Sequence, residues 1–160
     1  MIAANGLKAA ALALFVASVP AMAQTADPTR FATGPDVTAQ VAAMAKAMKP
    51  GQGFAWQPLV RDGKTVAALE YWKAPGKPAV HPEEAEYALV IEGSGTLVSG
   101  GTMADAKETR PGLVEGSRID GGTTRRLATG DVILVPAGVP HWFGIDGKLV
   151  LLGMKLLTSR

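Results

Sequence analysis

Short apolar segments, separated by glycine and proline, fill the chain after residue 51. Segments of this length between turn residues are typical of β-strands, whereas helices are usually longer. We expect strands at residues 56–61, 65–73, 86–92, 96–99, 123–128, 132–135, 141–145 and 148–157. No helical segments alternate with them, which disfavours a doubly wound parallel sheet. The pattern predicts an all-β sandwich or barrel.

One short helix is expected before the strands. Asp36 is a suitable N-cap residue, and Pro50 with Gly51 ends the helical segment after about residue 48. Four apolar residues at helical spacing share one face: Val37, Val41, Met44 and Met48. Methionine sulfur also suits copper, but this spacing favours packing against a core. Residues 24–52 are therefore interpreted as a flexible leader followed by a short helix.

The first 23 residues have the pattern of a secretory signal peptide. Lys8 precedes an apolar run from Ala9 to Val19, and Pro20 and the small residues of Ala21 to Ala23 follow. This order is typical of a peptide that is cleaved during export, and the run is too short to span a bilayer. We expect a mature chain from Gln24, located in the periplasm or outside the cell. A buried N-terminal helix is the alternative.

Composition limits the partners of the mature chain. Its length suits one domain at residues 53–160, with a substantial core. The chain has no cysteine, which excludes disulfides and thiolate metal sites. Its sixteen Lys and Arg, less Lys8, leave fifteen against fourteen Asp and Glu, and this balance argues against a nucleic-acid partner. No later segment is long and apolar enough for a membrane span.

Only two histidines are present, and each lies beside an expected strand. His81 comes shortly before the strand that begins at Glu86, and His141 opens a strand after the turn at Pro136 to Gly138. Imidazole is the commonest protein ligand for metals. Two imidazoles and a carboxylate that converge from separate strands would bind a metal ion. His81, Glu86 and His141 are therefore the candidate metal ligands.

Alternation along the strands predicts the surroundings of these ligands. Side chains two residues apart share one face of a strand, so Phe143 lies on the face of His141, and Ala88 and Val90 on that of Glu86. If Glu86 and His141 face the inside of a barrel, these apolar neighbours would shape a substrate pocket. A few polar groups in an apolar cup are typical of sites for small molecules.

The second histidine stretch resembles a motif of the cupin superfamily, G-x5-P-x-G-x2-H-x3-N. Gly130, Pro136, Gly138 and His141 match it in spacing, and Ile145 replaces the final Asn. The first cupin motif, G-x5-H-x-H-x3,4-E-x6-G, is matched by three residues and departs at two. The matches are His81, Glu86 and Gly93; Lys73 and Ala79 replace the leading Gly and the first His. The resemblance covers roughly residues 64–157.

The resemblance implies a cupin-type double-stranded β-helix, a jelly-roll barrel, with a mononuclear divalent metal inside. The ion would be iron, zinc or manganese, and coordination positions would stay open for chemistry. Water or Glu83 could supply a fourth ligand, although a solvated turn is the favoured interpretation of Glu83 and Glu84. Without a metal, Glu86 and an imidazole could form an acid/base pair.

Two functions remain open at this point. One is a metal-dependent enzyme that acts on a small organic molecule, by oxygenation at iron or by isomerase or lyase chemistry at a Lewis acid. The other is a non-catalytic module that binds or senses a small ligand, without a metal in one version. The sequence specifies neither the reaction nor the substrate.

Several further features have structural interpretations. Three aromatic residues on early strands could stack on a ligand, but core or dimer packing is favoured: Trp56, Tyr71 and Trp72. Gly93 to Gly95 is interpreted as a hairpin turn. Residues 100–122 form a polar segment that is either a lid or a surface loop. Cupins often dimerise through edge strands, as the resemblance implies, and Leu149 to Leu152 could pair with a second chain in a homodimer.

Overall fold

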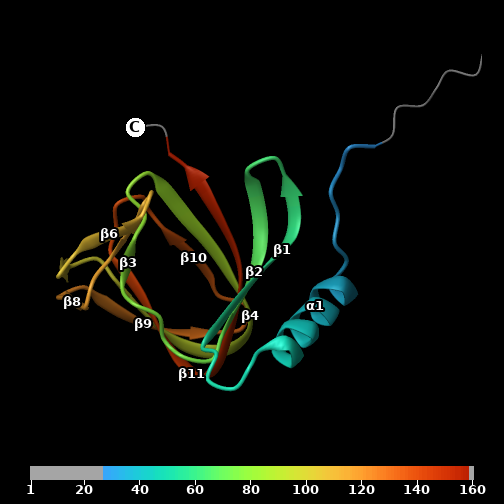
Figure 1. The fold of residues 1–160 in the computed structure, drawn as a ribbon, viewed down its shortest axis with the longest axis horizontal. Helices are drawn as coiled ribbons and strands as arrows, with labels where there is room; N and C mark the ends of the chain where they lie inside the picture. The colour runs from blue at the N-terminus through green and yellow to red at the C-terminus, as the bar shows by residue number, and fades with distance from the viewer. Residues whose placement is uncertain (1–26, 159–160) are drawn as a thin grey trace, which may run out of the picture.

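The computed structural model describes residues 27–158, which form a β-barrel with one helix on its outer side (Figure 1). The expected signal peptide lies outside the described residues. The elements are α1 (Gly34–Ala47), β1 (Phe54–Asp62), β2 (Thr65–Trp72), β3 (Ala79–Val80), β4 (Glu84–Ser99), β5 (Thr102–Ala104), β6 (Lys107–Arg110), β7 (Leu113–Glu115), β8 (Arg118–Asp120), β9 (Thr123–Ala128), β10 (Val132–Val135) and β11 (His141–Leu157). The predicted fold class, all-β with one short helix, is confirmed.

Two long antiparallel strands, β4 and β11, form the centre of the sheet. Their pairing runs from Ser99 opposite His141 to Glu84 opposite Leu157. β9 and β10 pair with the other side of β4, while β2, followed by β1, and β3, followed by β7 and β6, pair with β11. β5 and β8 form a separate two-stranded ladder. All of these pairings are antiparallel, so neighbouring strands bring sequence-distant residues side by side.

The predicted hairpin turn at Gly93 to Gly95 is wrong, because these residues continue β4. Gly93 has φ 86°, and a Cβ there would collide with the carbonyl oxygen of Lys148 on β11. The register shifts between Ile145 and Leu149 at the same place. Gly93 therefore permits a bulge and close approach within a continuous strand pair. The expected strands 141–145 and 148–157 are likewise one strand, β11.

Leu149 to Leu152 lies inside the sheet, which corrects its prediction as a pairing edge. Leu149 is opposite Trp72 of β2 on one side and opposite Gly93 of β4 on the other. Both edges of the segment are therefore occupied within the chain, and a second chain cannot pair with it. Homodimer formation through another surface stays a prediction, which sedimentation of the mature protein would test.

The helix begins three residues earlier than predicted, because its N-cap is Thr33 and not Asp36. Thr33 Oγ1 accepts a hydrogen bond from the Asp36 backbone N–H, and the Asp36 carboxylate accepts one from the Thr33 N–H, at 2.9 Å. This reciprocal pair is a capping box. Pro35 belongs to the helix because its missing N–H has no partner to lose in the first turn.

Two apolar clusters use opposite faces of the sheet. The methionine face of α1 packs on the outer face, with Val41, Met44 and Met48 against a buried group formed by Leu69, Tyr71 and Val150. The inner cluster contains Ala88, Val90 and Phe143 among its buried residues. Because Leu69 and Tyr71 face the helix, the alternate residues of β2 face the barrel interior. No helix in the described part of the chain could cross a membrane.

The polar segment 100–122 consists largely of paired strands. β5 pairs with β8, and β6 pairs with β7, which in turn pairs with β3. The β6–β7 hairpin contributes Arg110, Leu113 and Glu115 to the lining of the cavity described below. Part of this segment therefore forms a wall of the candidate site.

Candidate metal centre

The three predicted ligands converge inside the barrel. One ligand atom from each of His81, Glu86 and His141 lies within 4.8 Å of the others. The Nε2 atoms of His81 and His141 are 3.4 Å and 3.6 Å from the same Oε2 of Glu86. All three residues are buried, at 7%, 5% and 4% relative exposure. Three donors this close, in one buried group, are spaced for a single shared ion.

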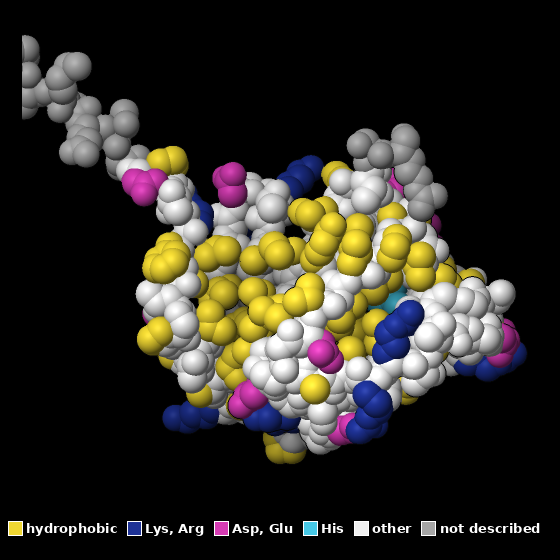
Figure 2. Space-filling view, turned by 180° about the vertical axis from the view of Figure 1, so that it is seen from behind, with side chains coloured by type: hydrophobic (Ala, Val, Ile, Leu, Met, Phe, Trp, Pro, Cys, Tyr) yellow, Lys and Arg dark blue, Asp and Glu magenta, His cyan; other side chains and the backbone are white. Residues whose placement is uncertain are grey.

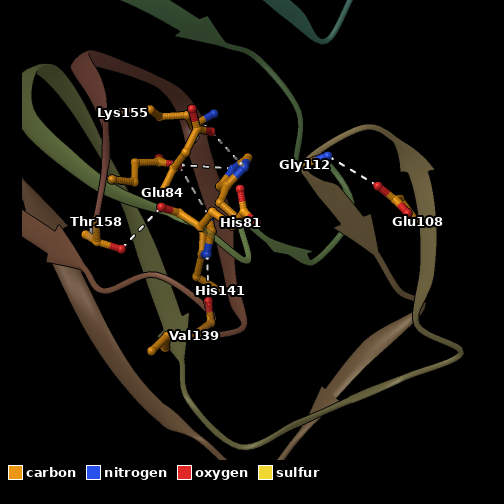
Figure 3. A network of polar contacts seen from close by, with 10 residues as sticks. His81, Glu84, Glu108, Gly112, Val139, His141, Lys155 and Thr158 are labelled. Carbon is orange, nitrogen blue, oxygen red and sulfur yellow. Dashed lines mark hydrogen bonds and ion pairs between the residues drawn. The ribbon is translucent and has the colours of Figure 1, made fainter. Parts of the chain in front are cut away.

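Each ligand comes from a different segment. His81 directly follows β3, Glu86 lies in β4, and His141 opens β11. Gly138, with φ 78°, forms the corner before β11, and its N–H donates to the His81 carbonyl oxygen at 2.8 Å. The corner that aims His141 thus also holds the backbone of His81. In Figure 3 both imidazoles lie side by side in this interior.

Hydrogen bonding sets the tautomer of His141. Its Nδ1 lies 3.1 Å from the Val139 carbonyl oxygen, which can only accept, so Nδ1 carries the proton. The lone pair then resides on Nε2, the atom that faces Glu86. This partner outside the ligand group orients the ring as metal-binding histidines require.

Electrostatics favour the metal-binding forms of His81 and Glu86. Burial lowers the pKa of His81 to about 4, and the Lys155 charge adds to the effect, so the imidazole is neutral. For Glu86, burial favours the protonated carboxyl, but it is outweighed by His141, which supplies a hydrogen bond and a positive charge when its ring is protonated, and by the charges of Lys155 and of protonated His81. The net effect lowers the pKa of Glu86 to about 2. A neutral imidazole and a carboxylate are the donor forms, so the residues fit a divalent ion.

Glu83 and Glu84 follow His81 closely in the sequence, but neither joins the ligand group. Glu83 is exposed, and its carbonyl accepts hydrogen bonds from the Thr158 N–H and hydroxyl at 3.0 and 3.2 Å. Glu84 Oε2 lies 4.0 Å from Nδ1 of His81, on the side away from Glu86. The ligand group within residues 27–158 is therefore two histidines and one glutamate.

Glu70 and Lys155 also belong to the site and were missed by the sequence analysis. Lys155 Nζ lies 3.6 Å from Oε2 of Glu86, which it faces directly across β11 and β4. Glu70 accepts a hydrogen bond from Trp72 Nε1 at 3.2 Å. The Glu70 carboxylate lies over Gly153: a Cβ added at Gly153 would be 3.4 Å from Oε1 of Glu70. Burial and the Glu86 charge raise the pKa of Glu70 to about 7.

The sequence carried a signal for Glu70. Leu69 and Tyr71, on either side of it, are apolar and buried against the helix, so Glu70 occupies the opposite, inward face of β2. A carboxylate on the inner face of a barrel strand is costly to bury and therefore marks a functional position.

A cavity of about 320 Å³ opens onto the ligand group. Phe143 is part of its lining, with Phe54, Trp72 and Trp142, whereas Ala88 and Val90 lie in the inner apolar cluster and do not line it. Figure 2 shows histidine at the bottom of a hollow on the surface, between hydrophobic and basic side chains.

The other two aromatic candidates lie elsewhere. Tyr71 packs against the helix, as the core interpretation predicted. Trp56 is 46% exposed on β1 and borders a smaller neighbouring cavity, which also touches Glu70, Glu86 and Lys155. Trp72 is therefore the one residue of the predicted aromatic trio that reaches the larger cavity.

Comparison with known proteins identifies related folds. Hydroquinone 1,2-dioxygenase PnpCD, solved with Cd²⁺ and 4-hydroxybenzonitrile, is 16% identical with a TM-score of 0.53, over 74% of this chain and 71% of that one. The hydroquinone 1,2-dioxygenase of Sphingomonas sp. TTNP3, with 4-hydroxybenzoate bound, is 14% identical with a TM-score of 0.53, over 74% and 73%. A predicted oxalate decarboxylase from Thermotoga maritima is 15% identical with a TM-score of 0.48, over 66% and 81%.

At these identities the likeness to the two dioxygenases, whose TM-scores are above 0.5, shows a shared fold alone. A search of curated proteins found no match. The cupin family profile, in contrast, matches residues 64–150, which contain all three candidate ligands. This match covers more than half of the 160 residues. The chain therefore belongs to the cupin family.

Proposed function

We propose that this protein is a metal-dependent cupin that binds one divalent ion through His81, Glu86 and His141 and acts on a small organic molecule. The observation that carries the proposal is the common approach of both Nε2 atoms to one Glu86 oxygen in a buried group. Three protein ligands leave coordination positions free, which is typical of sites that do chemistry. The adjoining cavity provides room for the second reactant.

The chain's own residues support this use of the site. Nδ1 of His141 is occupied by the Val139 carbonyl, so Nε2 is free to bind an ion. A bound divalent ion would supply Lewis-acid chemistry, or redox chemistry if it is iron. Glu70 lies beside the ligand group with its pKa near 7, so its carboxyl could take up or release a proton close to neutral pH.

Metal analysis of the mature protein, residues 24–160, tests the proposal. The purified protein is stripped with chelator, reloaded with Fe²⁺, Zn²⁺ or Mn²⁺, and analysed by mass spectrometry of the elements. We expect one ion per chain in the parent, and its loss in His81→Ala, His141→Ala and Glu86→Gln. Glu83→Gln is the matched control and should retain the ion, because Glu83 lies outside the ligand group. A parent protein that takes up none of these ions contradicts the proposal.

A non-catalytic, metal-free binding module is the second candidate, and Lys155 favours it. Its ammonium group already lies 3.6 Å from the Glu86 oxygen that an ion would use. In this version the lysine neutralises Glu86, and the cup binds its ligand without a metal. A folded parent without metal that still binds a small molecule in the cavity would favour this candidate.

We also propose that the protein is exported. The support is the order of charge, apolar run and small residues within residues 1–23. Expression of the full chain in a bacterium, followed by fractionation and N-terminal sequencing, tests this. A periplasmic or secreted product that begins at Gln24 is expected, and an uncleaved cytoplasmic product contradicts it.

A further inference from the structure

Aromatic rings form a continuous wall from the surface to the ligand group. The Phe54 and Trp72 centroids are 4.1 Å apart, those of Trp72 and Phe143 6.5 Å, and those of Phe143 and His141 6.0 Å. Phe54 is 39% exposed at the outer end, and Phe143 is 7% exposed at the inner end. Each of the first three rings lines the cavity. A flat apolar ligand can stack along such a wall toward the ion.

The cations of the cavity differ in whether they are paired. Lys77 lies 3.9 Å from Glu115, and Lys155 lies 3.6 Å from Glu86. Arg110, on the β6–β7 hairpin, has no ion-pair partner among residues 27–158, and it is exposed where it lines the cavity. A guanidinium group binds a carboxylate through two parallel hydrogen bonds. The cavity therefore presents one free anion-binding group.

The charge and the size of the cavity further limit the classes of ligand that it can bind. Three cationic and three acidic side chains line the cavity, so a bound divalent ion would leave it net positive. This balance disfavours cationic ligands. The volume of about 320 Å³ is at the small end of the roughly 300–1,000 Å³ of ligand pockets. Nucleotides and oligosaccharides are therefore disfavoured, and a single ring with one acidic group fits.

We propose that the ligand of this site is a small aromatic carboxylate, with its ring against the Phe54–Trp72–Phe143 wall and its carboxylate on Arg110. This proposal rests on the proposed function in naming the substrate class of the same site. The ring would lie between the ligand group and the cavity mouth, and a ring substituent would face the ion. Arg110 would act as the residue that selects for the negative charge.

Calorimetric titration with matched ligands tests the proposal. The probes are benzoate with its monohydroxy derivatives, benzamide as the uncharged match, and cyclohexanecarboxylate as the match without a flat ring. We expect one-to-one binding of benzoate or a hydroxy derivative. Binding of benzamide and cyclohexanecarboxylate should be weaker by about tenfold or more, since each lacks one of the two recognised features.

Variants separate the two contacts. Arg110→Gln should weaken benzoate binding by about tenfold and leave benzamide unchanged, since only the charged contact is lost. Phe54→Ala should weaken both ligands. Arg61→Gln is the matched control, because Arg61 is also exposed and unpaired within the described residues but does not line the cavity. It should bind as the parent does.

Each titration is run on metal-loaded and on chelator-treated protein. If the metal analysis fails but benzoate binding still depends on Arg110, the substrate class stands and only the metal is lost. The substrate class is overturned if no aromatic carboxylate of the panel binds either form. Equal binding of benzoate and benzamide, or an Arg110→Gln variant that binds benzoate like the parent, also overturns it.

Discussion

Lys155 places an ammonium group beside the proposed metal position. Its Nζ is 3.6 Å from Glu86 Oε2, which both imidazoles also approach. A divalent ion at this oxygen would be repelled by the ammonium group. We expect Lys155→Met to raise the affinity for Zn²⁺ by about tenfold, the equivalent of about 1.4 kcal/mol. Competition titration with a chromogenic chelator measures this affinity.

Lys148 offers a matched control on the same strand. Its Nζ pairs with Glu92 at 2.9 Å on the surface, away from the ligand group. Lys148→Met should therefore leave Zn²⁺ affinity unchanged. If Lys155→Met binds Zn²⁺ no more tightly than the parent, the lysine does not compete with the ion.

Two ionisable groups of the site have opposite effects on stability as the pH changes. Burial lowers the pKa of His81 from 6.5 to about 4, so the unfolded state binds more protons between these values. The contribution of His81 to the free energy of unfolding is therefore complete above pH 6.5 and is lost as the pH falls toward 4. Burial and the Glu86 charge raise the pKa of Glu70 from 4.5 to about 7, so the folded state binds more protons in that window. The Glu70 contribution is therefore complete below pH 4.5 and is lost as the pH rises toward 7.

Glu70→Gln separates these effects in the metal-free protein. In the parent, the stability that His81 adds as the pH rises from 4.5 to 6.5 is offset by the stability lost through Glu70. Glu70→Gln removes this offset. We expect the free energy of unfolding to increase more steeply over this range than in the parent, by about 1–3 kcal/mol in total. Urea denaturation at several pH values in chelator measures the slope. Glu83→Gln is the control at an exposed position and should have the parental slope. A parental slope in Glu70→Gln would instead show that folding does not change the pKa of the Glu70 carboxyl.

The sequence predicted the three ligand residues but not the two charged residues beside them, Glu70 and Lys155. His81, Glu86 and His141 were predicted because their spacing matches a motif. Glu70 and Lys155 lie outside any motif, and their role depends on which face of β2 and β11 is the inside. Alternation alone groups side chains into two faces, but packing decides which face meets the helix.

At the scale of elements, the β4–β11 pair depends on glycine at a single close approach. A Cβ at Gly93 would collide with the Lys148 carbonyl, and the φ of 86° is unfavourable for other residues. Gly147 has a similar φ of 76°, but a Cβ there meets nothing within 4 Å. We expect Gly147→Ala to cost about 1 kcal/mol and Gly93→Ala clearly more, because its strand backbone must also move. Thermal unfolding of both variants measures the difference, and equal losses would contradict the bulge interpretation.

Glycine also explains why strand existence was easier to predict than strand continuity. A glycine with positive φ serves a turn or a bulge equally well, so Gly93 to Gly95 had the signature of a hairpin. The pairing partner decides between these outcomes, and it lies more than fifty residues away in β11. The helix start had the same difficulty, because both Thr33 and Asp36 are good capping residues.

At the scale of the whole molecule, the proposed ion would add a side-chain link between three segments that backbone pairing already brings together. His81 follows the two-residue strand β3, whereas Glu86 and His141 lie on the long central strands. An ion bound to all three would join the β3 and β6–β7 wall to the centre of the barrel. Because the unfolded chain cannot assemble this group, binding adds to the free energy of unfolding.

This linkage predicts a thermal shift without any assay of activity. At a free Zn²⁺ concentration 100 times Kd, the gain is about 2.7 kcal/mol. For a domain of this size, that corresponds to a rise in Tm of roughly 5–15 °C. Chelator should reverse the rise, His81→Ala should abolish it, and Glu83→Gln should preserve it. If His81→Ala showed the same shift as the parent, Zn²⁺ would be stabilising the fold from another position, since His81 is the ligand that joins β3 to the central strands.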